Sequence, residues 1–170
     1  YLKRLNERLQ AVGGTAKADM DDAYAIGTPG EVFEATEEFL GGLRSIGLMA
    51  NVAKFEVWSP VADLTNNRAR LRLGIPLKDP GLPQGVAVAG APVGDAAYQA
   101  EGATKLGDKV AGVIDKLTDA LRGSPHHLWV AARLSAQTKF DYYLQHIPPE
   151  HTEEGARRVD DAIKRAMRAC

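Results

Sequence analysis

The spacing of apolar residues changes near Gly94, and this change divides the chain into two regions of different structure. Before Gly94, short alternating stretches stand between helical stretches and turns rich in glycine and proline. After it, apolar residues recur at helical intervals, with breaks at residues 123–125 and 148–149. We therefore expect an α+β fold with two domains, residues 1–94 of mixed structure and residues 95–170 of helices.

Helices are expected at residues 1–12 and 29–46 of the first region. The second of these begins at a strong signal, because Thr28 is a good N-cap, Pro29 suits the first helical position and Glu31 completes a capping box. Gly47 is expected to end it.

The first region is also expected to contain two hairpins and two further strands. The ranges are 15–20 with 23–26, then 55–58 and 68–73, and last 86–88 with 93–94 around the Gly90-Ala91-Pro92 turn. In the strand at 68–73, alternation would put Arg68, Arg70 and Arg72 on one face. That face would either contact phosphates or form a solvated sheet edge.

Three helices are expected in the second region. They cover residues 95–121, 128–146 and a last stretch that Thr152 caps and that ends near Arg168. Trp58, Trp129, Tyr142 and Tyr143 are expected mostly in the core or at the junction of the two regions.

Composition excludes several classes of protein. The chain has 170 residues, 45% of them hydrophobic, which suffices for an ordinary buried core. Its 21 basic and 22 acidic side chains give a net charge of -1, so a polybasic tail protein is excluded. A single cysteine, Cys170, allows no internal disulfide. No apolar run approaches the ~20 residues that a membrane span needs, and we expect no membrane partner.

The acidic pair Asp21-Asp22 falls at the expected tip of the first hairpin. Adjacent carboxylates repel each other, and a divalent cation removes that cost. Hard oxygen ligands suit Mg²⁺, and two such ions can activate an attacking hydroxyl and stabilise a leaving pyrophosphate. The alternative is an ordinary solvated turn, since aspartate is common in turns.

Three segments together resemble reverse transcriptases of the non-LTR retroelement type. They are residues 18–27 (ADMDDAYAIG), residues 47–58 (GLMANVAKFEVW) and residues 88–94 (VAGAPVG), and they occur in the family's order. The resemblance implies an RNA-directed DNA polymerase, with residues 1–94 as the C-terminal part of the palm and residues 95–170 as a helical thumb.

The resemblance also implies roles for individual residues. Asp21 and Asp22 match the pair that binds Mg²⁺ (or Mn²⁺), and Lys54 matches a lysine near the phosphates of the incoming nucleotide. Gly90, Pro92 and Gly94 match the primer-grip turn. On the last helix, a row of basic residues would face a primer–template duplex; the row is Arg157, Lys164 and Arg168. The implied partners are an RNA template, a DNA primer and deoxynucleoside triphosphates.

Two departures from the family qualify these roles. Asp19 stands where the family has an aromatic residue, and the family's earlier palm strand with another catalytic aspartate would precede Tyr1. We therefore expect part of a longer enzyme that is inactive alone. The alternatives are a non-catalytic remnant that binds nucleic acid or protein, and an unrelated α+β scaffold. The basic row on the last helix would then be an ordinary exposed face.

Overall fold

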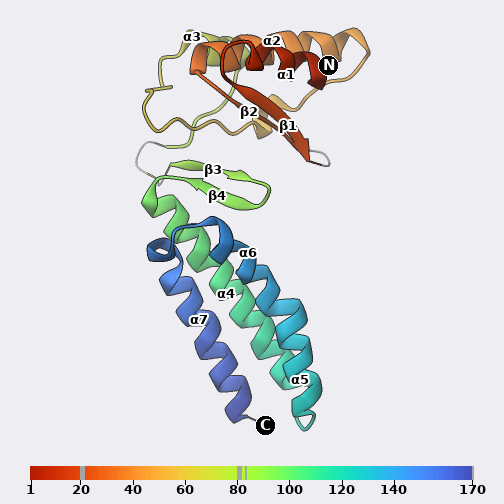
Figure 1. The fold of residues 1–170 in the computed structure, drawn as a ribbon, viewed down its shortest axis with the longest axis vertical. Coiled ribbons are helices and arrows are strands. Elements are labelled where there is room, and N and C mark those ends of the chain that lie inside the picture. The colour runs from red at the N-terminus through yellow and green to blue at the C-terminus, as the bar shows by residue number, and fades with distance from the viewer. Residues whose placement is uncertain (20–21, 80–81, 83, 170) are drawn as a thin grey trace. The chain divides into compact units, whose positions relative to one another are not determined.

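The chain forms an α+β structure that divides into two compact units, Tyr1–Leu82 and Pro83–Cys170 (Figure 1). The computed structural model describes residues 1–19, 22–79, 82 and 84–169. The expected fold class is confirmed: helices predominate, and the described strands form two small antiparallel sheets. The boundary between the compact units precedes the second hairpin, whereas the sequence predicted a division after Gly94.

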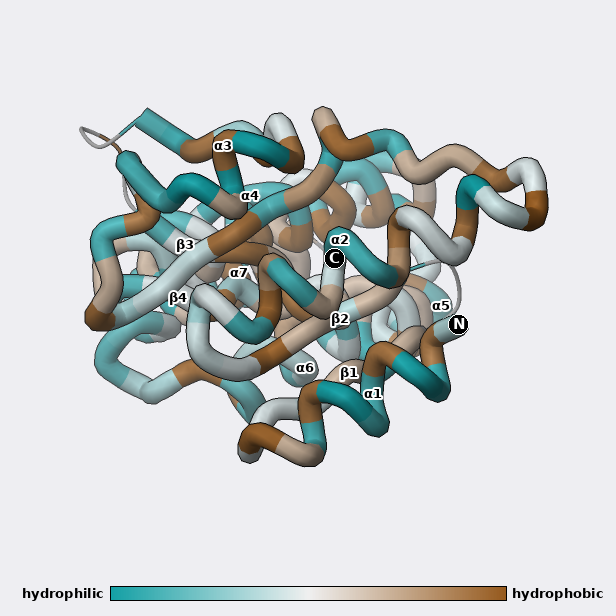
Figure 2. Tube along the Cα trace, turned by 90° about the horizontal axis from the view of Figure 1, so that it is seen from above, coloured by the Kyte–Doolittle hydropathy of each residue, from teal (hydrophilic) through white to brown (hydrophobic). Residues whose placement is uncertain are grey.

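The first unit pairs one hairpin with helices. Its elements are α1 (Leu2–Gln10), β1 (Thr15–Asp19), β2 (Asp22–Ile26), α2 (Pro29–Ser45), the short 3₁₀ turn η1 (Val52–Lys54) and α3 (Arg68–Leu73). Two apolar clusters form its core, one between α1, the hairpin and α2, the other around Phe33, Leu64 and Ile75. Figure 2 shows hydrophobic and hydrophilic residues alternating along α1, as expected for a helix with one buried side.

Two predicted strands of the first unit are wrong. Residues 55–58 form no regular element, and residues 68–73 form helix α3. The side chain of Asn67 accepts a hydrogen bond from the backbone N–H of Arg70 at 3.0 Å, and Gly74 ends the helix with a left-handed φ of 69°. These local caps, together with burial of Arg70 (8% exposed), favour a helix over the strand suggested by alternation.

The start of α2 differs in detail from the predicted capping box. Pro29 occupies the first turn as predicted, but the Thr28 hydroxyl donates to the carboxylate of Glu31 and does not cap a backbone N–H. The helix ends as predicted at Gly47, whose φ is +79°.

The second unit joins a hairpin to a helical bundle. Its elements are β3 (Gly85–Val88), β4 (Ala91–Gly94), α4 (Ala96–Ala120), α5 (Pro125–Ala131), the π-helical segment η2 (Ala132–Gln137), α6 (Thr138–His146) and α7 (Pro149–Arg168). The helix predicted at 128–146 thus begins at Pro125 and contains a π-helical segment. The last helix begins at Pro149, and Thr152 lies inside its first turns, donating to the Pro149 carbonyl at 3.1 Å; its predicted capping role is wrong.

Helices α4 and α7 approach each other closely through small residues. A Cβ atom added to Gly107 would lie 2.6 Å from the carbonyl oxygen of Gly155, so a larger side chain does not fit at this crossing. Arg165 of α7 pairs with Asp115 of α4 at 3.1 Å, and Arg158 pairs with Asp108. Among the described residues, no helix is both long enough and apolar enough to cross a membrane.

Candidate acidic turn and its predicted partners

The β1–β2 hairpin contains one described member of the acidic pair, Asp22, which lies in strand β2 and not in the turn predicted from the sequence. Its antiparallel register runs from Thr15 opposite Ile26 to Asp19 opposite Asp22. Asp22 is therefore the first residue of β2, directly after the turn. The predicted metal ligand Asp21 lies outside the described residues.

The carboxylate of Asp22 is exposed and has one described hydrogen bond. The hydroxyl of Tyr24 donates to its Oδ2 at 3.2 Å. Exposed carboxylate oxygens are the donor type that Mg²⁺ prefers. In the described part of the chain, no three His, Cys, Asp or Glu side chains are grouped so that they could hold a metal ion. Asp22 is thus one exposed carboxylate of the type that can bind Mg²⁺.

Helix α1 holds the base of this hairpin. The side-chain oxygen of Asn6 accepts from the backbone N–H of Ala16 at 2.8 Å and from the Thr15 hydroxyl at 3.2 Å. Leu9 and Ala16 are buried in the same cluster. Asn6 therefore satisfies a backbone donor of β1 and anchors the strand, so that the turn is presented on a supported hairpin.

Lys54 lies at the end of η1 with its side chain exposed. Its backbone N–H donates to the Asn51 carbonyl at 3.0 Å, so Asn51 acts here as a turn residue. Among the described residues, no hydrogen bond or ion pair joins Lys54 to Asp22. Lys54 and Asp22, two of the predicted site residues, are therefore not in contact in the structure.

The β3–β4 turn is held by two tyrosines of α6. Ala89 and Gly90 both have positive φ, 48° and 83°, as a two-residue type I′ turn requires. The hydroxyls of Tyr142 and Tyr143 donate to the carbonyls of Ala89 and Gly90, at 3.1 and 3.0 Å. Sequence reasoning assigned these tyrosines only to the core or a junction, because nothing local links them to a turn 53 residues away.

The other two primer-grip matches also have close packing partners. Pro92 is buried, and a Cβ added to Gly102 of α4 would lie 2.9 Å from its Cγ. A Cβ on Gly94 would lie 2.3 Å from the Gln84 carbonyl oxygen. Packing inside the second unit is therefore enough to explain a proline at position 92 and a glycine at position 94.

The predicted basic row on α7 is largely paired within its own helix. Arg157 contacts Glu154 at 2.7 Å, and Lys164 contacts Asp161 at 3.5 Å. Hydrogen bonds from Arg157 and then Arg158 hold the pKa of the Glu154 carboxyl below its usual range. Arg168 is exposed, and no ion pair involves it among the described residues.

No family model, curated protein or solved structure matches this chain. A functional assignment therefore depends on the pattern of residues and on the geometry described above.

Proposed function

We propose that this chain is the C-terminal palm and thumb part of a reverse transcriptase of the non-LTR type, an RNA-directed DNA polymerase in its longer parent. One observation carries the proposal. The register of β1 and β2 ends with Asp19 opposite Asp22, so that Asp22 begins β2 at the turn end of the hairpin, and α2 follows directly.

The order of the remaining elements supports the same proposal. After α2 come the 47–58 segment with its η1 turn, the β3–β4 hairpin with Gly90, Pro92 and Gly94, and then the helices of the second unit. This is the order of the three segments that resemble the family.

In this proposal Asp21 and Asp22 hold Mg²⁺, or Mn²⁺ in its place. When bound, the metal would neutralise the triphosphate and activate the attacking primer hydroxyl. Lys54 would steer the phosphates of the deoxynucleoside triphosphate, and the hairpin and helices of the second unit would grip the duplex of RNA template and DNA primer. The family's other catalytic aspartate has no match here, so we expect no polymerisation by this chain alone.

Mn²⁺ titration followed by NMR tests the metal site directly. We expect paramagnetic broadening of the amide signals of Asp21 and Asp22 at low Mn²⁺, and its loss in Asp22→Asn. Asp160-Asp161 of α7 provides a matched control, because it is an adjacent acidic pair on a regular helix, with Asp161 already paired to Lys164. Equal broadening at both pairs, or none at the turn, would refute the proposed site.

A second candidate is a non-catalytic segment that binds nucleic acid or a protein. The exposed Arg168, which has no ion pair in the described part of the chain, favours a contact with an anionic partner, whereas Arg157 and Lys164 are paired with carboxylates of α7. Fluorescence anisotropy with an RNA–DNA hybrid should then show affinity that falls with salt and is unchanged by Asp21→Ala. Salt-independent binding would count against this candidate.

A further inference from the structure

The segment that follows α2 exposes apolar side chains in close succession. Ile46, Leu48 and Met49 are 55%, 54% and 90% exposed. Single exposed apolar residues are normal on a protein surface, but contiguous ones mark interaction sites. Met is a common choice at such sites because its flexible thioether adapts to its partner.

The backbone holds this segment in a defined conformation. The N–H of Gly47 donates to the Arg44 carbonyl and the N–H of Leu48 to the Leu43 carbonyl, both at 3.0 Å. With the positive φ of Gly47, this is a Schellman motif. Leu48 and Met49 are thus presented by an ordered helix end, which lowers the entropy cost of binding.

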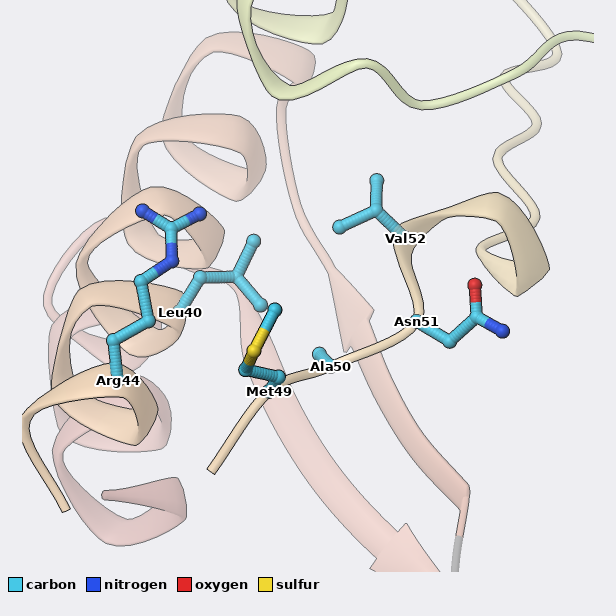
Figure 3. A pocket seen from close by; sticks show the side chains of 6 residues that line it. All are labelled: Leu40, Arg44, Met49, Ala50, Asn51 and Val52. Atoms are coloured by element: carbon cyan, nitrogen blue, oxygen red, sulfur yellow. The ribbon is translucent and has the colours of Figure 1, made fainter. Parts of the chain in front are cut away.

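A depression of about 490 Å³ lies beside this helix end. It is lined by Leu40, Arg44, Met49, Ala50, Asn51 and Val52. Figure 3 shows Leu40, Met49 and Val52 pointing toward one another, Arg44 running alongside Leu40, and the side chain of Asn51 pointing away. The depression therefore has an apolar floor and one cationic wall. We call it, together with Ile46 and Leu48, the α2-end patch.

Arg44 is a cation without a described carboxylate partner. Arg8 and Arg72 of the same unit pair with glutamates of α2, whereas no ion pair involves Arg44 among the described residues. The negative end of the α2 helix dipole stabilises the charge of Arg44, which lies in the last turn. This interaction does not use the N–H donors of the guanidinium, which stay available to an acceptor. The residues lining the depression include no carboxylate. A carboxylate from outside would bind the guanidinium fork in a charge-assisted contact.

We propose that the α2-end patch is a docking surface for an acidic, apolar segment of another protein. An apolar side chain of that segment fills the space between Leu40, Met49 and Val52, and a neighbouring carboxylate binds Arg44. A second copy of this chain is a poorer occupant. A two-fold axis through the patch would bring the two Arg44 side chains together with no lining carboxylate to separate them. The proposal is independent of the polymerase assignment.

The test is an NMR titration of the full chain with two synthetic peptides. One is acetyl-Glu-Leu-Phe-Glu-amide, and the other has glutamine in place of both glutamates. We expect amide shifts confined to residues 40–52 and about tenfold tighter binding of the acidic peptide, since a charge-assisted contact contributes on that scale.

Matched variants separate charge from apolar contact. Arg44→Gln should remove the preference for the acidic peptide, and Arg44→Lys should keep part of it. Arg68→Gln, an equal charge change at an exposed residue of α3, should keep all of it. Met49→Ser should weaken both peptides at least threefold, whereas Val61→Ser, at a residue that is 92% exposed, should not.

Three results would overturn the proposal. The first is absence of binding by either peptide at millimolar concentration. The second is equal affinity for the two peptides, or an equal loss of the preference for the acidic peptide in Arg44→Gln and Arg68→Gln. The third is concentration-dependent self-association of the chain that Met49→Ser abolishes, which would assign the patch to a second copy.

Discussion

At the scale of single residues, Arg70 shows how a charge can be buried without a counter-ion. Its Nε donates to the Leu64 carbonyl at 3.0 Å, Nη1 to Ile75 at 2.6 Å and Nη2 to Thr65 at 2.9 Å. No carboxylate pairs with it in the described part of the chain. The guanidinium therefore ties backbone carbonyls of the segments before and after α3 to the helix, which explains why this arginine points inward.

We predict that Arg70→Met lowers the free energy of unfolding of the first unit by about 2–4 kcal/mol, because buried carbonyls lose charged donors. Arg72→Met is the matched control. Arg72 is exposed and pairs with Glu37 only at the surface, so its loss should cost less than about 1 kcal/mol. Urea unfolding followed by Trp58 fluorescence in a Trp129→Phe background measures both. Equal effects would contradict the structural role of Arg70.

A second residue-scale prediction concerns Tyr143 and alkaline pH. Burial, and then the neighbouring Tyr98 and Tyr142, raise the pKa of Tyr143 above its ordinary value of 10.0. The unfolded chain therefore loses this proton first, and the free energy of unfolding of the second unit falls as pH rises above 10.0 through the raised pKa.

Tyr143→Phe should flatten this fall, and Tyr24→Phe, in the first unit, should leave it unchanged. Urea unfolding followed by Trp129 fluorescence in a Trp58→Phe background, repeated across alkaline pH, measures the slope. A slope identical in wild type and Tyr143→Phe would show that Tyr143 does not contribute.

At the scale of elements, the π-helical segment η2 has a geometric cause. Leu128 and Phe140 are each 2% exposed and lie in the same core cluster, twelve residues apart. Twelve residues of regular α-helix would turn the second side chain about 120° away from the first, whereas eleven would leave only about 20°. The wider π turn absorbs the extra residue and keeps both side chains in the core.

This account predicts that deleting Leu134 is tolerated. Leu134 lies in η2 and is 68% exposed, and its removal should leave a continuous α-helix with an unfolding free energy within about 1 kcal/mol of wild type. Circular dichroism and thermal unfolding measure this. Deleting Lys109 from the regular helix α4 should instead misalign Val110 and Ile114 and unfold the unit. Equal damage from both deletions would argue against the account.

At the scale of the whole molecule, the β3–β4 hairpin belongs to the same unit as the helices. Tyr142 and Tyr143 of α6 hold its turn. At its base, the Asp95 carboxylate accepts from the backbone N–H groups of Gln84 at 2.8 Å and Tyr98 at 2.7 Å, which lowers the pKa of Asp95. Hydrogen bonds therefore hold the hairpin at both of its ends, at the turn through Tyr142 and Tyr143 and at the base through Asp95.

We predict that a chain beginning at Pro83 folds with the same stability as the second unit of the full protein. A chain beginning at Asp95, the boundary predicted from sequence, should lose the hairpin contacts and melt about 10 °C lower, because at least two hydrogen bonds disappear. Thermal unfolding by circular dichroism compares the two. Identical melting temperatures would place the structural boundary after Gly94.

The sequence by itself determined the features whose causes are local. The helix after Thr28, the stop at Gly47 and the presence of two hairpins were predictable, since caps, turns and alternation act over a few residues. The details of the hairpins were wrong, because Asp22 begins β2, and the second turn is Ala89-Gly90 and not the predicted Gly90-Ala91-Pro92. The helix at Arg70 also has local signals, the caps Asn67 and Gly74, which the alternation of residues 68–73 outweighed in the sequence-based prediction, whereas only the tertiary structure decided the π turn and the attachment of the hairpin to α6. The attachment of the hairpin depends on groups brought together from distant positions, such as Tyr142 and Ala89, and no local pattern encodes such contacts.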